Sequence, residues 1–164
     1  IANSFNQLYG ETFVLPEARI AEEVMTIPGT DGQKMSKSYG NIIDIFLPDK
    51  ELRKQIMTII TDSTPLEEPK NPDTDNVFAI YKLISTPEET ETLKQKYQAG
   101  NFGYGHAKQE LYELIVRKYA KEREAFDHYM NHLDDLEKKL SQGEEKARVI
   151  AMTLLEKVRK KLGY

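Results

Sequence analysis

Residues 34–38 combine more charged and reactive groups than any other short stretch of the chain. They read Lys34-Met35-Ser36-Lys37-Ser38, so two ammonium groups and two hydroxyls lie within five positions. Lysine is a compact cation suited to phosphate oxygens, and hydroxyls and free backbone N–H groups are short, directional donors. Glycines on both sides let the backbone approach a ligand closely. Such a loop has the groups to clamp a triphosphate and to stabilise charge on departing pyrophosphate. Taken alone, the pattern also fits a solvated basic turn, so its context decides.

The elements that must position this loop are predicted from periodicity, β-branching and chain breakers. Residues 1–9 carry apolar side chains at helical spacing and end at a glycine, which indicates a helix. Residues 12–15 and 24–27 are short, β-branched and bounded by prolines, which predicts strands. Residues 42–47 form an apolar strand or extended segment. Beyond residue 48 the apolar period is helical, so the sequence predicts a mainly α protein in which a short α/β segment leads into an α-helical bundle.

Caps and breakers divide the bundle into helices. We predict helices at about 49–60, 76–84, 87–98, 106–133 and 144–162. Asp75 or Asn76 is a suitable N-cap, and Thr86 with Glu89 forms a capping box around a proline at the first helical position. Residues 141–143 are expected to break the chain at Gly143. The apolar face of the last helix is expected to pack into the bundle.

Composition limits the classes to which this protein can belong. The chain has 164 residues, 39% of them hydrophobic and 30% charged, which fits one globular domain or two small ones. No apolar run approaches the length of a membrane helix. Cysteine is absent, which excludes disulfides and a cysteine-ligated zinc. His128 and His132 are the only closely spaced histidine pair and lack a Glu-x-x-His pattern, so we predict no metal held by the protein.

The charge is unevenly distributed along the chain. The net charge is −4, but residues 1–104 hold 10 basic against 16 acidic side chains, whereas residues 105–164 hold 13 against 11. The last twenty residues carry six lysines and arginines against two glutamates. This basic tail fits contact with a nucleic-acid backbone, and it equally fits a helix C-terminus, where cations complement the helix dipole.

The stretch at 34–38 resembles the KMSKS signature of class I aminoacyl-tRNA synthetases, and the resemblance extends along nearly the whole chain. Further stretches are similar to the bacterial tryptophanyl-tRNA synthetase family in its order and about its spacing: NQLYGETFVLPE at 6–17, VMTI at 24–27, IITDS at 59–63, GYGHAK at 103–108 and GEEKARVIA at 143–151. The resemblance implies that residues 1–48 are the C-terminal end of a Rossmann-like catalytic nucleotide-binding domain. It also implies that residues 49–164 are an α-helical tRNA- and anticodon-binding domain.

The resemblance also implies roles for individual residues. Lys34 and Lys37 would be catalytic, holding the ATP triphosphate and stabilising the transition state as the tryptophan carboxylate attacks the α-phosphorus. The ATP-binding residues carried over from the family are Val24, Lys34, Met35, Ser36, Lys37 and Ser38. Val24 would contribute to the adenine site, the serines would donate hydrogen bonds to phosphate, and Met35 would anchor the loop. Mg²⁺ is expected on the ATP phosphates rather than in a protein cage.

The implied partners are ATP, tryptophan and tRNA(Trp), and the implied enzyme is a cytoplasmic homodimer. The family's other ATP signature and its tryptophan pocket have no counterpart here, so we expect the chain to be part of a longer enzyme and inactive alone. Two alternatives stay open. One is a synthetase for another amino acid, tyrosine first, and the other is a non-catalytic helical RNA-binding paralogue. Tyrosines and arginines of the helical region offer suitable types for reading RNA bases, but no single one is assigned.

Overall fold

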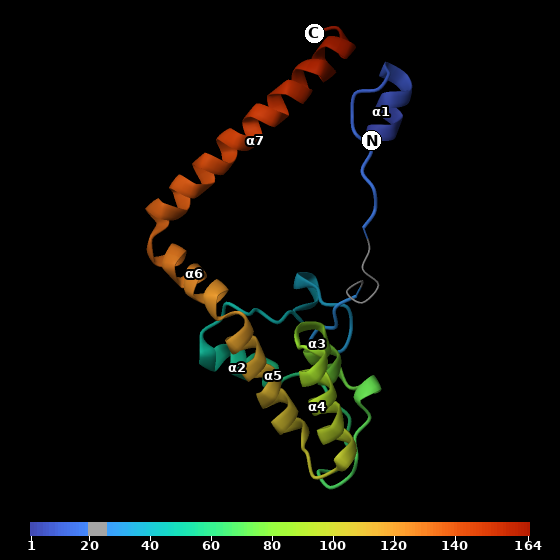
Figure 1. Cartoon of the computed structure of the whole chain (residues 1–164), viewed down its shortest axis with the longest axis vertical. Coiled ribbons are helices and arrows are strands. Elements are labelled where there is room, and N and C mark those ends of the chain that lie inside the picture. Colours follow the sequence, from blue (N-terminus) through green and yellow to red (C-terminus); the bar gives the residue numbers. More distant parts are fainter. Residues whose placement is uncertain (20–25) are drawn as a thin grey trace. The chain divides into compact units, whose positions relative to one another are not determined.

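The computed structural model describes residues 1–19 and 26–164, and helices are the only regular elements among them. In chain order they are α1 (Ala2–Tyr9), η2 (Lys37–Tyr39), α2 (Asp49–Met57), η3 (Pro72–Thr74), α3 (Asn76–Ile84), α4 (Pro87–Ala99), α5 (Tyr104–Lys118), α6 (Ala120–Asn131) and α7 (Leu133–Leu162) (Figure 1). The chain forms two compact units. The helical unit comprises residues 21–126, and the terminal unit comprises residues 1–20 and 127–164.

The core of the helical unit lies where α5 packs against α2 and α3, with α4 against α3. Its buried apolar residues come from α2 to α5 and from the turn after α2: Leu52, Ile56, Ile59, Val77, Phe78, Ile80, Tyr81, Leu93, Tyr97, Ala107, Leu111, Leu114 and Ile115. The helical spacing of Leu52, Ile56, Ile59 and Ile60 and of Val77, Ile80, Tyr81 and Ile84 predicts one inward face on each of these two helices. The structure buries all of these residues except Ile60, which is exposed, and Ile84, which is partly buried. The predicted helical bundle exists in this unit.

The helix starts of this unit are set by local chemistry that the sequence shows. Asp75 caps α3, because its side chain accepts a hydrogen bond from the backbone N–H of Phe78 at 2.8 Å. At α4, Thr86 accepts from the N–H of Glu89 at 3.2 Å, while the Glu89 carboxylate accepts from the N–H of Thr86 at 2.9 Å. The predicted capping box is thus present, and α4 ends at Ala99, one residue beyond the predicted end, with Gly100 as its C-cap.

The strand predictions do not hold for the described residues. Residues 12–15 lack a strand, because the N–H groups of Thr12 and Phe13 donate to the side chain of Asn6 instead of to a partner strand. A strand requires a second strand to pair with its backbone, and in the described part of the chain only Pro28 and Lys34 form a β-bridge. Residues 42–47 form no strand, and residues 45–47 lie in a turn in which the N–H of Leu47 donates to the oxygen of Asp44 at 3.3 Å. Of the predicted strand at 24–27, the first two residues lie outside the described ranges.

The terminal unit contains α1 and α7. Helix α1 ends as predicted at Gly10, whose φ of 80° suits glycine. Lys161 near the end of α7 donates to the backbone oxygen of Tyr9 at 2.8 Å. Gly163 ends α7 in the left-handed conformation with a φ of 86°, as expected for a C-cap glycine.

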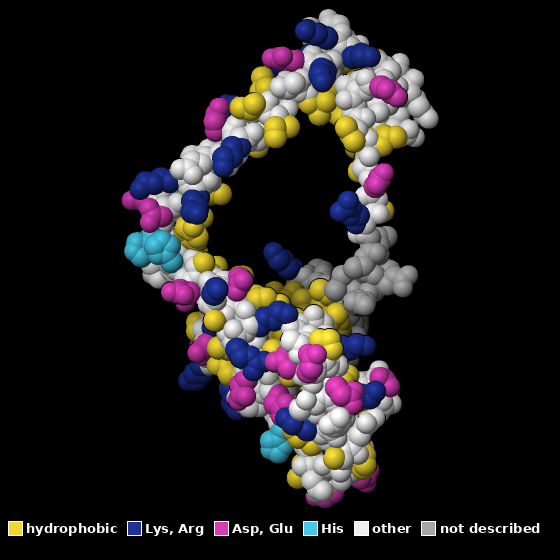
Figure 2. Space-filling view, in the orientation of Figure 1, with side chains coloured by type: hydrophobic (Ala, Val, Ile, Leu, Met, Phe, Trp, Pro, Cys, Tyr) yellow, Lys and Arg dark blue, Asp and Glu magenta, His cyan; other side chains and the backbone are white. Residues whose placement is uncertain are grey.

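Two predictions for the C-terminal region are wrong. No break occurs at residues 141–143, because Gly143 keeps a helical backbone and α7 runs unbroken for 30 residues. Glycine weakens a helix but does not prevent it. The helix predicted at 106–133 is instead divided at Tyr119, whereas the break at His132 lies next to its predicted end. The apolar face of the last helix is also not buried, since α7 has no buried residue. Figure 2 shows hydrophobic side chains gathered along one side of α7 and charged ones along the other.

None of the described helices combines the length and the apolar character that crossing a membrane requires.

Candidate phosphate-binding loop

Residues 27–41 fold into a tight backbone structure that carries the stretch at 34–38. A β-bridge joins Pro28 to Lys34, and the N–H of Gly29 donates to the oxygen of Gln33 at 2.7 Å. The N–H of Met35 donates to the oxygen of Ile27 at 2.8 Å. The short helix η2 follows and ends at Gly40, whose φ is 66°. Both ends of the loop are thereby fixed by backbone hydrogen bonds. We call residues 27–41 the clamp loop.

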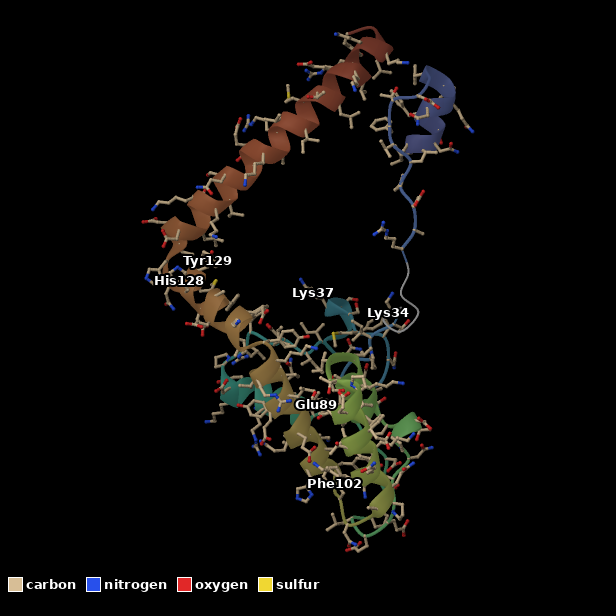
Figure 3. All side chains as sticks on the ribbon, viewed as in Figure 1. Lys34, Lys37, Glu89, Phe102, His128 and Tyr129 are labelled. Atoms are coloured by element: carbon tan, nitrogen blue, oxygen red, sulfur yellow. The ribbon has the colours of Figure 1, made fainter. Side chains whose placement is uncertain are left out.

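The side chains of the predicted phosphate clamp are presented at the surface. Lys34, Lys37 and Ser38 are exposed, and Ser36 is partly exposed with its hydroxyl 2.8 Å from that of Ser38. Across the described ranges neither lysine forms an ion pair. Figure 3 shows Lys34 and Lys37 on the clamp loop, with the side chain of Lys37 projecting away from the helices. Two cations and two hydroxyls therefore remain available to an anionic ligand.

Asn41 lies beneath this surface, and the sequence did not single it out. Its side chain is only 3% exposed. Its Oδ1 accepts from the N–H of Ser36 at 2.8 Å, and its Nδ2 donates to the backbone oxygen of Lys34 at 3.1 Å and to Oδ1 of Asp31 at 2.7 Å. The hydrogen bond from Asn41 is the main cause that lowers the pKa of the Asp31 carboxyl below its ordinary value. Asn is a common turn residue, but nothing local in the sequence reveals that this one is buried.

Gly29 is part of the same arrangement. A Cβ atom on Gly29 would lie 2.5 Å from the side-chain Cγ and Nδ2 of Asn41 and from its backbone oxygen. The N–H of the next residue, Thr30, donates to that backbone oxygen at 2.9 Å. Position 29 therefore needs glycine for close approach rather than for an unusual backbone angle.

Within the helical unit, the turn of the clamp loop is hydrogen-bonded to the segment after α2, which in turn contacts α3. The N–H of Ile60 donates to the oxygen of Thr30 at 2.8 Å, and the side chain of Asn76 donates to the oxygen of Ile60 at 2.9 Å. Asn76 is the first residue of α3, and its side chain lies so close to Gly32 that a Cβ there would meet it at 2.7 Å. Met35 lies beside an apolar groove of about 340 Å³ that residues of α3 and α5 also line. The expectation that Met35 contacts apolar neighbours agrees with this position.

Val24, which was expected near adenine, lies outside the described residues. No group of three or more histidine, cysteine, aspartate or glutamate side chains that could hold a metal occurs in the described ranges. Several side chains with suitable types for base recognition have other partners. Tyr104 donates to Asp62 at 2.6 Å, and Arg123 contacts Asp49 at 2.7 Å.

Comparison with known proteins decides the family. Residues 1–120 match the family model described as tRNA synthetases class I (W and Y). The chain belongs to this family. Within the family, it is 48% identical to a tryptophan–tRNA ligase of Fusobacterium nucleatum over 99% of this chain and 50% of the relative. It is 42% identical to a tryptophan–tRNA ligase of Rhodopirellula baltica, again over 99% of this chain and 51% of the relative.

A solved class I synthetase has the same fold over this chain. Tryptophanyl-tRNA synthetase from Campylobacter jejuni, complexed with ADP and tryptophan, matches with a TM-score of 0.84 at 44% identity. The match covers 99% of this chain and 51% of that one. The chain thus spans about half the length of the tryptophan-specific relatives described here.

Proposed function

We propose that this chain supplies the ATP-phosphate clamp and a helical tRNA-binding region to an enzyme that joins tryptophan to tRNA(Trp). The observation that carries the proposal is the clamp loop, which presents Lys34 and Lys37 without protein counter-ions in the described ranges. The relative that was solved with ADP and tryptophan supports an adenine nucleotide as the ligand. Residues 1–48 would belong to the Rossmann-like catalytic domain and residues 49–164 to the domain that binds tRNA.

The first reaction step needs little acid–base chemistry. A tryptophan carboxylate oxygen forms a bond to the α-phosphorus of ATP, the bond from that phosphorus to the β-phosphate bridging oxygen breaks, and pyrophosphate leaves. The carboxylate is already an anion, so no general base is required. Negative charge accumulates on the leaving pyrophosphate, and the ammonium groups of Lys34 and Lys37 would stabilise it there.

The other residues of the clamp would bind and orient the nucleotide. The hydroxyls of Ser36 and Ser38 would donate to phosphate oxygens, while Met35 would hold the loop against its apolar neighbours. Val24 would contact adenine. Mg²⁺ bound to the ATP phosphates would supply additional positive charge, and it needs few protein ligands there. In the second step a ribose hydroxyl of the tRNA would attack the carbonyl carbon of the adenylate, and AMP would leave.

The amino acid is assigned from the relatives. The family model covers both tryptophan and tyrosine enzymes, whereas the relatives described above are tryptophan–tRNA ligases. This favours tryptophan over tyrosine and favours an enzyme over a non-catalytic RNA-binding paralogue. The assembled enzyme would act in the cytoplasm as a homodimer.

The proposal is tested by ATP–pyrophosphate exchange with the full-length protein. We expect exchange that depends on tryptophan and is absent with tyrosine, and no exchange from residues 1–164 alone. Exchange that depends on tyrosine instead would assign the chain to the tyrosine enzymes of the family. Exchange with neither amino acid, together with retained tRNA binding, would replace the enzyme by a non-catalytic RNA-binding protein.

A further inference from the structure

We infer that Asn41 is a positioning residue of the phosphate clamp, held in place by Asp31, and that it fixes the backbone from which Lys34 and Lys37 reach the phosphates. The inference rests on the proposed function of the clamp loop. In this inference Asn41 contacts no phosphate itself and acts through Lys34 and Ser36, the residues on either side of Met35.

The Asn41 side chain bridges the clamp backbone on both sides of Met35. It accepts from the N–H of Ser36 at 2.8 Å and donates to the oxygen of Lys34 at 3.1 Å. A single amide group thereby sets the distance between the peptide groups before and after Met35. Because the lysines are long and flexible, the direction in which they leave the surface depends on this backbone.

Asp31 determines which way the Asn41 amide points. The Asp31 carboxylate accepts only, so the group 2.7 Å from it must be the NH₂ of Asn41. Asp31 also accepts from the N–H of Gln33 at 3.0 Å, which holds its carboxylate within the turn. The opposite orientation of the amide would place its oxygen against both the carboxylate and the backbone oxygen of Lys34. The three contacts are thus mutually consistent in one orientation only.

Asn41 has few groups left with which to bind a ligand. Both N–H bonds of its amide are used, its oxygen already accepts one hydrogen bond, and its side chain is 3% exposed. Gly29 closes the remaining side, since even a methyl group there would overlap Asn41. Water cannot easily replace a buried partner, so loss of the amide would leave the N–H of Ser36 and the oxygen of Lys34 without partners. The clamp loop would then relax to another backbone shape.

The test measures single-turnover adenylate formation in the full-length protein with Asn41→Ala and Asn41→Asp. The aspartate variant keeps the shape of the side chain and an acceptor for Ser36, but it has no donor for Lys34 and adds a charge beside Asp31. We expect both variants to lower the rate at saturating ATP by about 10- to 100-fold. The tryptophan KM should stay within about twofold, because the clamp acts on the phosphates.

A second arm separates positioning from a general loss of stability. If Asn41 acts through the two clamp lysines, Asn41→Ala should lower the rate less than about threefold further in a protein that already carries both Lys34→Ala and Lys37→Ala. Asn71→Ala is the matched control: Asn71 caps η3 in the same unit by accepting from the N–H of Asp73 at 3.0 Å. It should leave the rate unchanged. Asp31→Asn keeps an acceptor for the Asn41 amide and should have a milder effect than Asn41→Ala.

The outcomes distinguish this inference from the proposed function. A large effect of Lys34→Ala with no effect of either Asn41 variant would overturn the positioning role and leave the clamp intact. An Asn41→Ala effect that is undiminished in the protein carrying both Lys34→Ala and Lys37→Ala would also overturn it. An unchanged rate for Lys34→Ala would instead refute the proposed function. Circular dichroism and thermal unfolding are recorded for each variant, and if Asn41→Ala does not fold, Asn41→Asp carries the test.

Discussion

Replacement of Asp75 by alanine tests how the helical unit that carries the clamp loop is held together. Asp75 is 6% exposed, and its Oδ1 accepts from the N–H of Phe78 and from the hydroxyl of Tyr97, both at 2.8 Å. Tyr97 is fully buried. The single carboxylate therefore caps α3 and joins it to α4. Asn76, which contacts the turn of the clamp loop, is the next residue.

The expected cost of Asp75→Ala follows from these two contacts. Loss of an N-cap costs about 1 kcal/mol, and a buried hydroxyl without an acceptor costs about 1–3 kcal/mol. Together they lower the free energy of unfolding by about 2–4 kcal/mol where the carboxyl is protonated in the folded protein. Burial raises the pKa of Asp75 above its ordinary value, because desolvation disfavours the charged form, so the wild type also bears the cost of a buried charge wherever the carboxyl is ionised.

The sign of the pH dependence follows from this raised pKa. A group with a raised folded-state pKa contributes stability at low pH and loses it as the pH rises through that pKa. The difference between wild type and Asp75→Ala should therefore be larger at about pH 4 than at about pH 7.5. The free energies of unfolding of wild type and Asp75→Ala are measured by urea unfolding at each pH, and amide hydrogen exchange of α3 and α4 localises the effect. Asp73→Ala, at an exposed position nearby, is the control and should change stability by less than about 0.5 kcal/mol.

Tyr97→Phe isolates the cost of leaving the buried Tyr97 hydroxyl without an acceptor. In a protein that already carries Asp75→Ala, it removes the unpaired hydroxyl and should restore part of the lost stability. This account of Asp75 would be refuted if Asp75→Ala lowered the free energy of unfolding by less than about 0.5 kcal/mol at both pH values, or if the decrease grew as the pH rises.

Two further expectations concern α7. Gly143→Ala should stabilise this helix by about 0.5–1 kcal/mol, because the position is helical and a Cβ there meets nothing within 4 Å. Slower amide exchange around residue 143 would show this stabilisation, whereas destabilisation would contradict the unbroken helix. Neutralising Lys160 and Lys161 should flatten the salt dependence of tRNA binding by up to about two units of slope if both contact phosphate, with Lys138→Ala on the same helix as control. An unchanged slope would assign them instead to the helix dipole.

Local chemistry explains which parts of the fold could be predicted. The capping box of Thr86 and Glu89, the cap at Asp75 and the ends of α1 and α7 depend on residues within a few positions of one another. The capping box, the glycine end of α1 and the end of α7 at residue 162 were predicted, and Asp75 was one of the two caps offered for α3. The buried faces of α2 and α3 followed from apolar spacing for the same reason.

Features that depend on distant parts of the chain were not predictable in this way. Residues 12–15 have the composition of a strand, but a strand forms only where another strand pairs with it. The break expected at Gly143 is absent, and the break at Tyr119, which involves neither glycine nor proline, was not predicted. The break at His132 lies next to the predicted helix end at residue 133. The clamp lysines were proposed from their types and spacing together with the family resemblance along the chain, because the pentapeptide alone also fits a solvated basic turn. Asn41 was missed because its importance arises only when the loop folds over it.

The most direct measurement of the central claim is the rate of adenylate formation in single turnovers of the full-length protein with Lys34→Ala and with Lys37→Ala. Lys82→Ala, an exposed lysine of α3, is the control. Each charge-assisted contact to phosphate contributes about 1.5–3 kcal/mol, so each clamp variant should react about 10- to 150-fold more slowly while binding tryptophan normally. Rates equal to those of Lys82→Ala would contradict the assignment of residues 34–38 as the phosphate clamp.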